Sequence, residues 1–186
     1  MTVIQAEGYI IRLARPEELL RLTEIELDAF ATLAAARGDG SEPHALPHDL
    51  LRHSLEDDLL FVAADGANRP MGFLAGTERD ETLYINEVDV VRAWQRRGVG
   101  RRLMATAIET ARASRLRGVT LTTDRFVPFN APFYARLGFA EIEDGDALPE
   151  LRKALATEAA AGVGGERRVA MILRFTQPHG TPVRAG

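Results

Sequence analysis

The chain has 186 residues, of which 23 are basic and 27 acidic, so its formal charge at pH 7 is −4. Hydrophobic residues make up 46% and charged residues 27%, which are ordinary values for a globular protein and argue against a disordered chain. Cysteine is absent, which excludes disulfides, thiolate zinc sites and a cysteine nucleophile.

The length predicts one domain, because a typical domain has roughly 100–200 residues. We expect this domain to span residues 1–177 and to be followed by a disordered tail over 178–186. Residues 1–7 contain no basic stretch followed by an apolar one, so no signal peptide is expected. No apolar run approaches the roughly 18 residues of a membrane helix. The expectation is a cytoplasmic protein without membrane contact.

The first half of the chain alternates strand and helix patterns. Pro16 predicts the start of a helix, since proline is favoured in the first turn and two glutamates follow it. Leucine, isoleucine, alanine and phenylalanine then recur at three- and four-residue spacing. The expected elements are a strand over 9–13, a helix from 16, a loop over 37–43, a helix from 47, and strands over 59–64, 71–76 and 82–91.

The second half continues the alternation. The expected elements are a helix over 100–116, a strand over 119–123, a short helix over 130–137, a strand over 139–142, a helix from 149 and a strand over 169–175. Alternating strands and helices of these lengths predict an α/β domain with a mixed sheet.

The net charge conceals a basic segment. Residues 92–102 contain five arginines and no acidic residue, so the remaining 175 residues carry −9. Because the local field attracts a ligand more than the net charge does, this segment is a candidate anion site.

Within this segment, Gln95-Arg96-Arg97-Gly98-Val99-Gly100 lies between a predicted strand and a predicted helix. A helix N-terminus presents unpaired N–H groups and partial positive charge, which suit a phosphate or pyrophosphate. The segment matches neither a Walker A loop nor the three-glycine dinucleotide fingerprint. The alternative interpretation is a plain strand-to-helix turn.

The pattern Gln-x-x-Gly-x-Gly resembles motif A of the GNAT superfamily of N-acetyltransferases. Farther along, Phe133-Tyr134-x-x-x-Gly138-Phe139 is similar to the core of the family's motif B, and residues 11–17 resemble its opening strand and helix. The resemblance covers roughly residues 9–176. It implies a mixed, mostly antiparallel central sheet of about six or seven strands, flanked by helices and splayed at the cofactor cleft.

The resemblance also implies acetyl-CoA as the co-substrate. Its pyrophosphate would bind the loop, and its pantetheine arm would pair with the free edge of the preceding strand. A main-chain N–H of that strand would stabilise the oxyanion of the tetrahedral intermediate. The implied cofactor-binding residues are Val88, Asp89, Val90, Arg96, Arg97, Gly98, Val99, Gly100, Arg101 and Asn130.

Two residues are implied as catalytic. Glu87 is the preferred general base for the acceptor amine, and Asp89, on the same face of the strand, is the second candidate. Tyr134 matches the family tyrosine that protonates the leaving thiolate. The plainer interpretations are a solvated or ion-paired Glu87, a structural Asp89 and a core aromatic role for Tyr134.

Asn130 departs from the family pattern. Many members carry an asparagine seven residues before the tyrosine, and that position here is Val127. Asn130 stands four residues before Tyr134, where it would either contact the pantetheine arm or cap the short helix.

Neither a metal nor a nucleic acid is expected as a partner. His44, His48 and His53 are interpreted as surface histidines. Arg112, Arg115 and Arg117 are interpreted as a solvated helix end, because no aromatic residues are interleaved with them. The expected acceptor is a small-molecule or peptide amine, which the acidic residues Asp39, Glu42 and Asp49 could attract. A homodimer is left open.

The resulting hypothesis is an acetyl-CoA-dependent N-acetyltransferase that acts on a primary amine by direct attack in a ternary complex. The alternatives are a non-catalytic CoA-binding sensor and an enzyme that transfers a longer acyl group.

Overall fold

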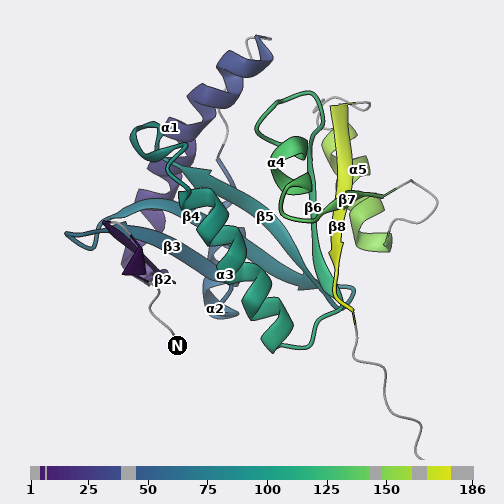
Figure 1. The fold of residues 1–186 in the computed structure, drawn as a ribbon, viewed down its shortest axis with the longest axis horizontal. Helices are drawn as coiled ribbons and strands as arrows, with labels where there is room; N and C mark the ends of the chain where they lie inside the picture. The colour runs from purple at the N-terminus through teal and green to yellow at the C-terminus, as the bar shows by residue number, and fades with distance from the viewer. Residues whose placement is uncertain (1–4, 7, 39–44, 143–147, 161–166, 177–186) are drawn as a thin grey trace, which may run out of the picture.

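The computed structural model describes residues 5–6, 8–38, 45–142, 148–160 and 167–176, so the expected tail over 178–186 lies outside the described residues. The described strands form one sheet with helices on both faces (Figure 1). The strands are β1 (Gln5–Ala6), β2 (Tyr9–Leu13), β3 (Leu60–Asp65), β4 (Pro70–Arg79), β5 (Thr82–Val90), β6 (Gly118–Asp124), β7 (Ala140–Glu141) and β8 (Arg168–Arg174). The helices are α1 (Leu19–Arg37), α2 (His48–Glu56), α3 (Val99–Ala113), α4 (Ala131–Ala135) and α5 (Pro149–Ala160), with 3-10 turns over Pro16–Glu18 and Arg92–Trp94.

The sheet has the strand order β1-β2-β3-β4-β5-β6-β8-β7. Among the described strands β5 and β6 are the one parallel pair, and every other neighbouring pair is antiparallel. In the described part of the chain six strands have five residues or more, and the two edge strands have two each. The expected mixed, mostly antiparallel sheet is therefore confirmed. A parallel pair needs a crossover connection, and here α3 provides it.

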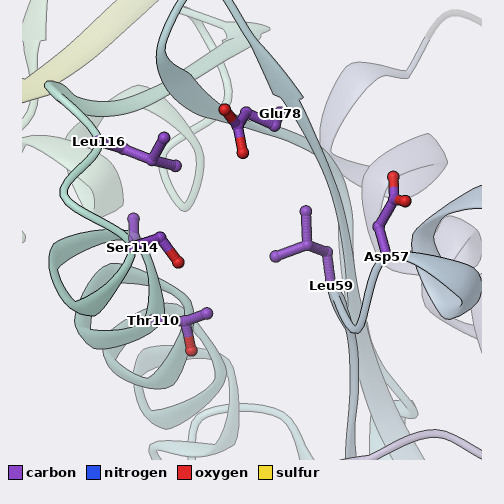
Figure 2. Close-up of a pocket in the computed structure, with 7 residues that line it drawn as sticks. Asp57, Leu59, Glu78, Thr110, Ser114 and Leu116 are labelled. Atoms are coloured by element: carbon purple, nitrogen blue, oxygen red, sulfur yellow. The ribbon is translucent and has the colours of Figure 1, made fainter.

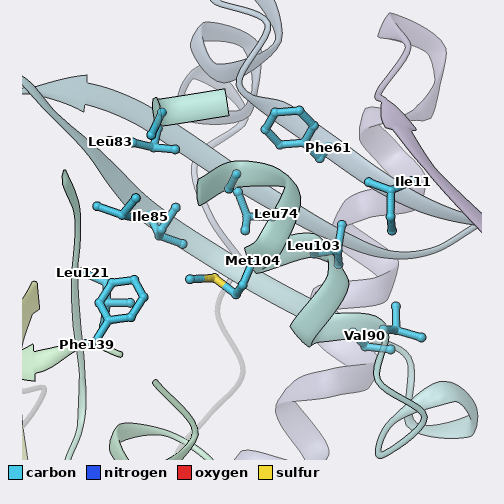
Figure 3. Close-up of a cluster of buried hydrophobic side chains, with 14 of the residues drawn as sticks. Ile11, Phe61, Leu74, Leu83, Ile85, Val90, Leu103, Met104, Leu121 and Phe139 are labelled. Carbon is cyan, nitrogen blue, oxygen red and sulfur yellow. The ribbon is translucent and has the colours of Figure 1, made fainter. Parts of the chain in front are cut away.

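Helix α3 covers one face of the sheet. Leu103 and Met104 are fully buried and point toward Leu74, Ile85 and Val90 of the central strands (Figure 3). Full burial of side chains of this size stabilises the fold by about 1.5–3 kcal/mol each. This packing fixes the N-terminus of α3 beside the end of β5.

Helices α1, α2 and α5 cover the opposite face. Leu22 and Ile25 of α1 and Leu51 of α2 are fully buried against Phe73 of β4. Leu151 of α5 packs with residues of β5 and β8 in a separate cluster. The face that α1 buries was predicted from its three- and four-residue spacing.

The pairing of β5 with β6 stops halfway along β5. It runs from Thr82 opposite Gly118 to Ile85 opposite Leu121, whereas β6 continues to pair with β8 as far as Asp124. Figure 1 shows the two strands diverging beyond this point. The expected splay of the sheet is confirmed. Among the described strands, residues 86–90 have a partner on the β4 side alone.

A β-bulge sets the side-chain directions of this open segment. Ala75 is opposite Glu87 but Gly76 is opposite Ile85, so Asn86 is an extra residue in β5. The amide of Asn86 donates to Thr77 Oγ1 at 2.7 Å. Because the bulge shifts the alternation by one residue, Val88 joins Ile85 on the α3 face. The odd-numbered Glu87 is consequently directed to the α1 face.

The predicted elements agree with the structure within a few residues at most boundaries. The exceptions are the edge strands: β1 was not predicted, and residues 139–142 contribute only two residues to β7. A two-residue strand carries too little periodicity to be recognised. None of the described helices combines the length and the hydropathy needed to cross a membrane.

Gly118 has no room for a side chain, because a Cβ atom there would lie 2.3 Å from the main-chain oxygen of Leu173. We expect Gly118→Ala to lower the free energy of unfolding by at least about 2 kcal/mol through separation of β6 from β8. Urea denaturation measures this change. Gly66→Ala is the matched control, since a Cβ there meets nothing within 4 Å, and its effect is expected within about 0.5 kcal/mol. Equal stability of the two variants would contradict the assigned β6–β8 register.

Candidate active site

The predicted phosphate loop forms a tight turn into α3. Gly98 occupies the N-cap position with φ 81°, and Arg96 also has a positive φ of 59°. The first helical bond runs from Arg102 N to Gly98 O at 3.1 Å. By helix geometry, the N–H groups of residues 99–101 have no carbonyl partner within the helix. The sequence-predicted residues from Arg96 to Arg101 therefore do form a helix N-terminus.

Side chains of α1 hold this loop in place. Thr32 Oγ1 donates to Gln95 Oε1 at 3.0 Å, and Gln95 Nε2 donates to Val90 O at 3.0 Å. One turn earlier on α1, Asp28 accepts hydrogen bonds from the main-chain N and the Nε of Arg92, at 2.7 and 2.9 Å. Gln95, the first residue of the motif, thus positions the loop against β5 and α1.

The arginines of the basic segment differ in their surroundings. Arg92 is ion-paired with Asp28, and the guanidinium of Arg97 lies 5.1 Å from the ring centre of Trp94. Arg96, Arg97 and Arg101 are exposed. These exposed cations surround the helix N-terminus and add to its positive field.

Three carboxyl groups meet at the open segment of β5. Oxygen atoms of Glu26, Glu87 and Asp89 all lie within 4.8 Å of one another. Glu26, from α1, is 6% exposed, whereas Glu87 and Asp89 are half-buried. Glu26 Oε1 accepts the N–H of Leu46 at 2.8 Å, but its buried Oε2 has no hydrogen-bond partner among the described residues. We call Glu26, Glu87 and Asp89 the acidic cluster.

Burial and mutual repulsion keep protons on the acidic cluster. Burial first, and the Glu87 carboxylate second, raise the pKa of Glu26 from 4.5 to about 7 against the opposing bond from Leu46. Burial, then Glu87 and Glu26, raise the pKa of Asp89 well above its usual value. Like charges this close cannot all ionise near neutral pH, so the cluster shares protons.

Tyr134, in α4, packs against the core cluster on the α3 face of the sheet. Its ring makes edge contacts with Phe133 and Phe139, at centroid distances of 5.1 and 5.9 Å. Burial, and next the carboxylates of Glu87 and Asp89, raise the pKa of the Tyr134 phenol above its usual value, and the guanidinium of Arg168 opposes this. The phenol is therefore protonated at neutral pH and lies within electrostatic reach of the acidic cluster.

The other predicted residues of the site have mixed surroundings. Val88 N–H donates to Glu87 Oε1 at 3.3 Å, so one of the main-chain donors expected to stabilise an oxyanion is engaged by a side chain. Asn130 occupies the N-cap position of α4, but its side chain makes no capping hydrogen bond. Its main-chain oxygen accepts the N–H groups of Phe133 and Tyr134.

Sequence reasoning missed Glu26. It lies among the apolar positions of α1, next to Ile25, and a glutamate at a buried helical position was the available signal. Of the predicted acidic residues near α2, Asp49 is ion-paired with Arg52, and Asp39 and Glu42 lie outside the described residues. Among the histidines, His53 Nδ1 contacts Asp49 O at 2.8 Å, and His44 is also outside the described residues.

Two of the three arginines interpreted as a solvated helix end have side-chain contacts within the chain. Arg112 lies over the ring of Phe175, and Arg117 pairs with Glu81 at 2.8 Å. A pocket lies near this end of α3 (Figure 2). Its lining residues are Asp57, Leu59, Glu78, Thr110, Ala111, Ser114 and Leu116. Helix α3 has 15 residues and is about 22 Å long, so this pocket is remote from the loop at Gly98.

Asp124, at the end of β6, forms ion pairs with residues of two other segments. Its buried carboxylate pairs with Arg37 of α1 at 3.2 Å and with Arg167 at 3.1 Å. Burial acts to raise the pKa of Asp124, but the Phe126 N–H and the two guanidinium groups outweigh it and lower the pKa. Asp124 is thus an ionised bridge between α1 and the start of β8.

Comparison with known proteins identifies relatives of this arrangement. A sequence model of the acetyltransferase (GNAT) family matches residues 19–139, which include the loop, the acidic cluster and Tyr134. A GNAT-family acetyltransferase from Staphylococcus aureus is 14% identical, with a TM-score of 0.64 over 91% of this chain and 100% of its own. The ribosomal-protein-S18-alanine N-acetyltransferase from Escherichia coli is 16% identical, with a TM-score of 0.65 over 95% and 99% of the two chains. The PaiA N-acetyltransferase from Thermoplasma acidophilum, solved with coenzyme A, is 14% identical, with a TM-score of 0.65 over 90% and 99%.

The raised pKa of Glu26 predicts a pH-dependent cost to stability. Between pH 4.5 and about 7 the folded state retains a proton that the unfolded chain has lost, so stability falls as pH rises through this window. We expect Glu26→Gln to exceed the wild type in free energy of unfolding by about 1.4 kcal/mol at pH 5.5 and by roughly 3 kcal/mol at pH 8.5. Urea denaturation at the two pH values measures the difference.

Glu24→Gln is the matched control, because Glu24 lies on the same helix but its side chain is 66% exposed. Its effect is expected to be small at both pH values. A Glu26→Gln variant that is equally destabilised at pH 5.5 and 8.5 would contradict the assigned protonation.

Proposed function

The chain belongs to the acetyltransferase (GNAT) family, and from this premise we propose that it transfers the acetyl group of acetyl-CoA to a primary amine by direct attack in a ternary complex. The observation that carries the proposal is the position of the loop at Gly98. It adjoins the open edge of β5, where the acidic cluster and Tyr134 also meet. A helix N-terminus, an open strand edge and titratable groups therefore lie side by side, which supports the proposal.

In this proposal the pyrophosphate of acetyl-CoA binds the N–H groups of residues 99–101 and the guanidinium groups of Arg96, Arg97 and Arg101. The pantetheine arm runs along residues 88–90, whose β6-facing edge has no partner strand in the part of the chain that the structure describes. The loop connects directly to this edge through Gln95, which is bonded to Val90 O. The coenzyme A bound to the structurally similar PaiA N-acetyltransferase supports a cofactor of this class. Asn130 is a further candidate contact for the arm.

The reaction requires three proton movements. A primary amine arrives as an ammonium ion and must lose a proton before its nitrogen can attack the thioester carbon. The attack forms a C–N bond and a tetrahedral oxyanion, which a main-chain N–H of the open segment of β5 stabilises. Collapse breaks the C–S bond, and the thiolate takes the Tyr134 proton. The nitrogen loses its second proton, which is returned through solvent to Tyr134, and Glu87 releases the first proton to solvent. The products are an amide, CoA thiol and one proton released to solvent.

Glu87, rather than Asp89, is the proposed base. Burial and the neighbouring carboxylates raise the pKa of Asp89 well above its usual value, so the ionised form that a base requires is disfavoured. Glu87 is half-buried and contacts the Val88 N–H, which brings its carboxylate to the edge where the thioester is proposed to lie. Glu87 can therefore accept the amine proton directly or through one water.

The loop is tested by the affinity for acetyl-CoA. Gly98 has a φ of 81°, which an alanine adopts at a cost, so Gly98→Ala should misdirect the N–H groups behind it. We expect at least about tenfold weaker acetyl-CoA binding by isothermal titration calorimetry. Gly38→Ala is the matched control, since Gly38 also has a positive φ and open space but lies outside the loop. Undetectable binding to the wild-type protein at millimolar acetyl-CoA would refute the proposed function.

The role of Tyr134 is tested by steady-state release of CoA thiol with a panel of amines. Tyr134→Phe removes the proton donor but retains the ring that packs on Phe133 and Phe139. We expect kcat to fall by about 10²–10⁴-fold with acetyl-CoA affinity nearly unchanged. Unchanged turnover would remove Tyr134 from the mechanism. Acetyl-CoA binding without thiol release from any amine in the wild type would indicate a CoA-binding sensor instead.

A further inference from the structure

We propose that the acidic cluster selects acceptors whose reacting ammonium has no carboxylate beside it, and that Glu26 of α1 sets this selectivity. The inference rests on the proposed acetyl transfer and narrows its substrate class to simple amines, amino sugars, or peptide amines in which the adjacent carboxyl is an amide. Free α-amino acids are excluded. In this assignment Glu26 is a positioning residue beneath Glu87.

The three carboxyl groups lie at two depths: Glu26 forms the buried floor of the cluster, and Glu87 and Asp89 form its accessible rim. Glu87 and Asp89 project from the open segment of β5 and are half-buried, so a ligand can reach them. Glu26 projects from α1 and is almost fully buried, with oxygen atoms within 4.8 Å of the two rim carboxyls. Its Oε2 has no hydrogen-bond partner among the described residues. A buried carboxylate oxygen without a donor is costly, and a cation at the rim relieves that cost.

Among the described residues, one positive charge that couples to Glu87 is already neutralised. It is the guanidinium of Arg168, which is held by Glu158 through bonds of 2.8 and 2.9 Å. Arg168 Nη2 also donates to Thr122 Oγ1 at 3.0 Å. Arg168 is therefore not available to bind a substrate carboxylate in place of Glu158. At pH 8, above the pKa of about 7 of Glu26, a carboxylate attached to the carbon next to the ammonium would be repelled by the carboxylates of Glu87 and Glu26.

An ammonium ion suits the cluster better than a divalent metal ion. Ca²⁺ takes six to eight oxygen ligands and Mg²⁺ requires an octahedron, whereas the cluster offers three carboxyl groups, of which the deepest is shielded from solvent. An ammonium has three donors directed at nearby acceptors. It would also sit where its proton can pass to Glu87 and within electrostatic reach of the Tyr134 phenol.

The experiment compares amines with the amino acids from which they differ by one carboxylate. The pairs are isopentylamine with leucine, 2-phenylethylamine with phenylalanine, tyramine with tyrosine and histamine with histidine. Leucinamide and phenylalaninamide restore the uncharged state without removing the bulk of the carboxyl group. Thiol release at pH 8 gives kcat/KM for each compound, and thermal melting with each compound alone reports binding without turnover.

We expect each amine and amide to exceed its amino acid at least about tenfold in kcat/KM, because repulsion between like charges a few ångströms apart has this magnitude at least. Glu26→Gln should reduce the ratio at least threefold by raising the rate with the amino acids relative to the amines. A purely structural role for Glu26 would lower both rates and leave their ratio unchanged. Glu24→Gln, which removes the same charge from the exposed side of α1, should leave the ratio unaltered.

The two proposals fail in different ways. Thiol release with amino acids at rates equal to those of their amines refutes the selectivity and leaves acetyl transfer standing. Stabilisation by amines but not by amino acids, without thiol release, supports the selectivity and refutes acetyl transfer. A larger rise in melting temperature with Mg²⁺ or Ca²⁺ alone than with any amine overturns the assignment of an ammonium. An unchanged ratio of amine to amino-acid kcat/KM in Glu26→Gln overturns the assignment of the selectivity to Glu26.

Discussion

The candidate site depends on the loss of pairing between β5 and β6 after Ile85 and Leu121. Main-chain N–H and C=O groups must be paired when they are removed from water, so an open strand edge inside a domain creates a demand for partners. The side chain of Glu87 meets part of that demand by accepting the N–H of Val88. An extended ligand would meet it more completely, as an added strand does. The opening also lets side chains from the two faces of the sheet influence one another, and so the phenol of Tyr134 and the acidic cluster become electrostatically coupled.

The bulge at Asn86 decides which groups reach this opening. Without the extra residue, Glu87 and Asp89 would follow Leu83 and Ile85 onto the apolar face under α3, where an ionised carboxyl is strongly disfavoured. With it, Val88 and Val90 occupy that face, and the two carboxyls turn toward α1. One inserted residue therefore satisfies the core on one side and assembles a titratable cluster on the other. This arrangement lowers the free energy of unfolding, because the buried carboxyl group of Glu26 is held beside two others.

Much of this arrangement was predictable from local sequence, and the rest was not, for identifiable physical reasons. The strand-to-helix loop at Gly98, the aromatic motif around Tyr134 and nearly all of the elements follow from short-range patterns, because capping residues, glycine positions and apolar spacing act over a few residues. The opposed faces of Glu87 and Val88 were also predicted, although the imperfect alternation of β5 did not reveal a bulge at Asn86. The contribution of Glu26 was missed, because it depends on how α1 lies across β5, 60 residues later in the chain. Such contacts are set by tertiary packing and leave no periodic signal.

Helix α1 serves both halves of the site with one rigid element. Glu26 belongs to the acidic cluster, whereas Asp28 and Thr32, on the following turns, hold Arg92 and Gln95 of the loop. A rotation of α1 that admits a new acceptor would therefore displace the anchors of the cofactor loop. A change in the orientation of α1 that alters which acceptors bind would consequently also alter the affinity for acetyl-CoA. Divergence of this protein toward a new substrate should proceed through side-chain exchange on a fixed α1, because reorientation of the helix would sacrifice the common co-substrate.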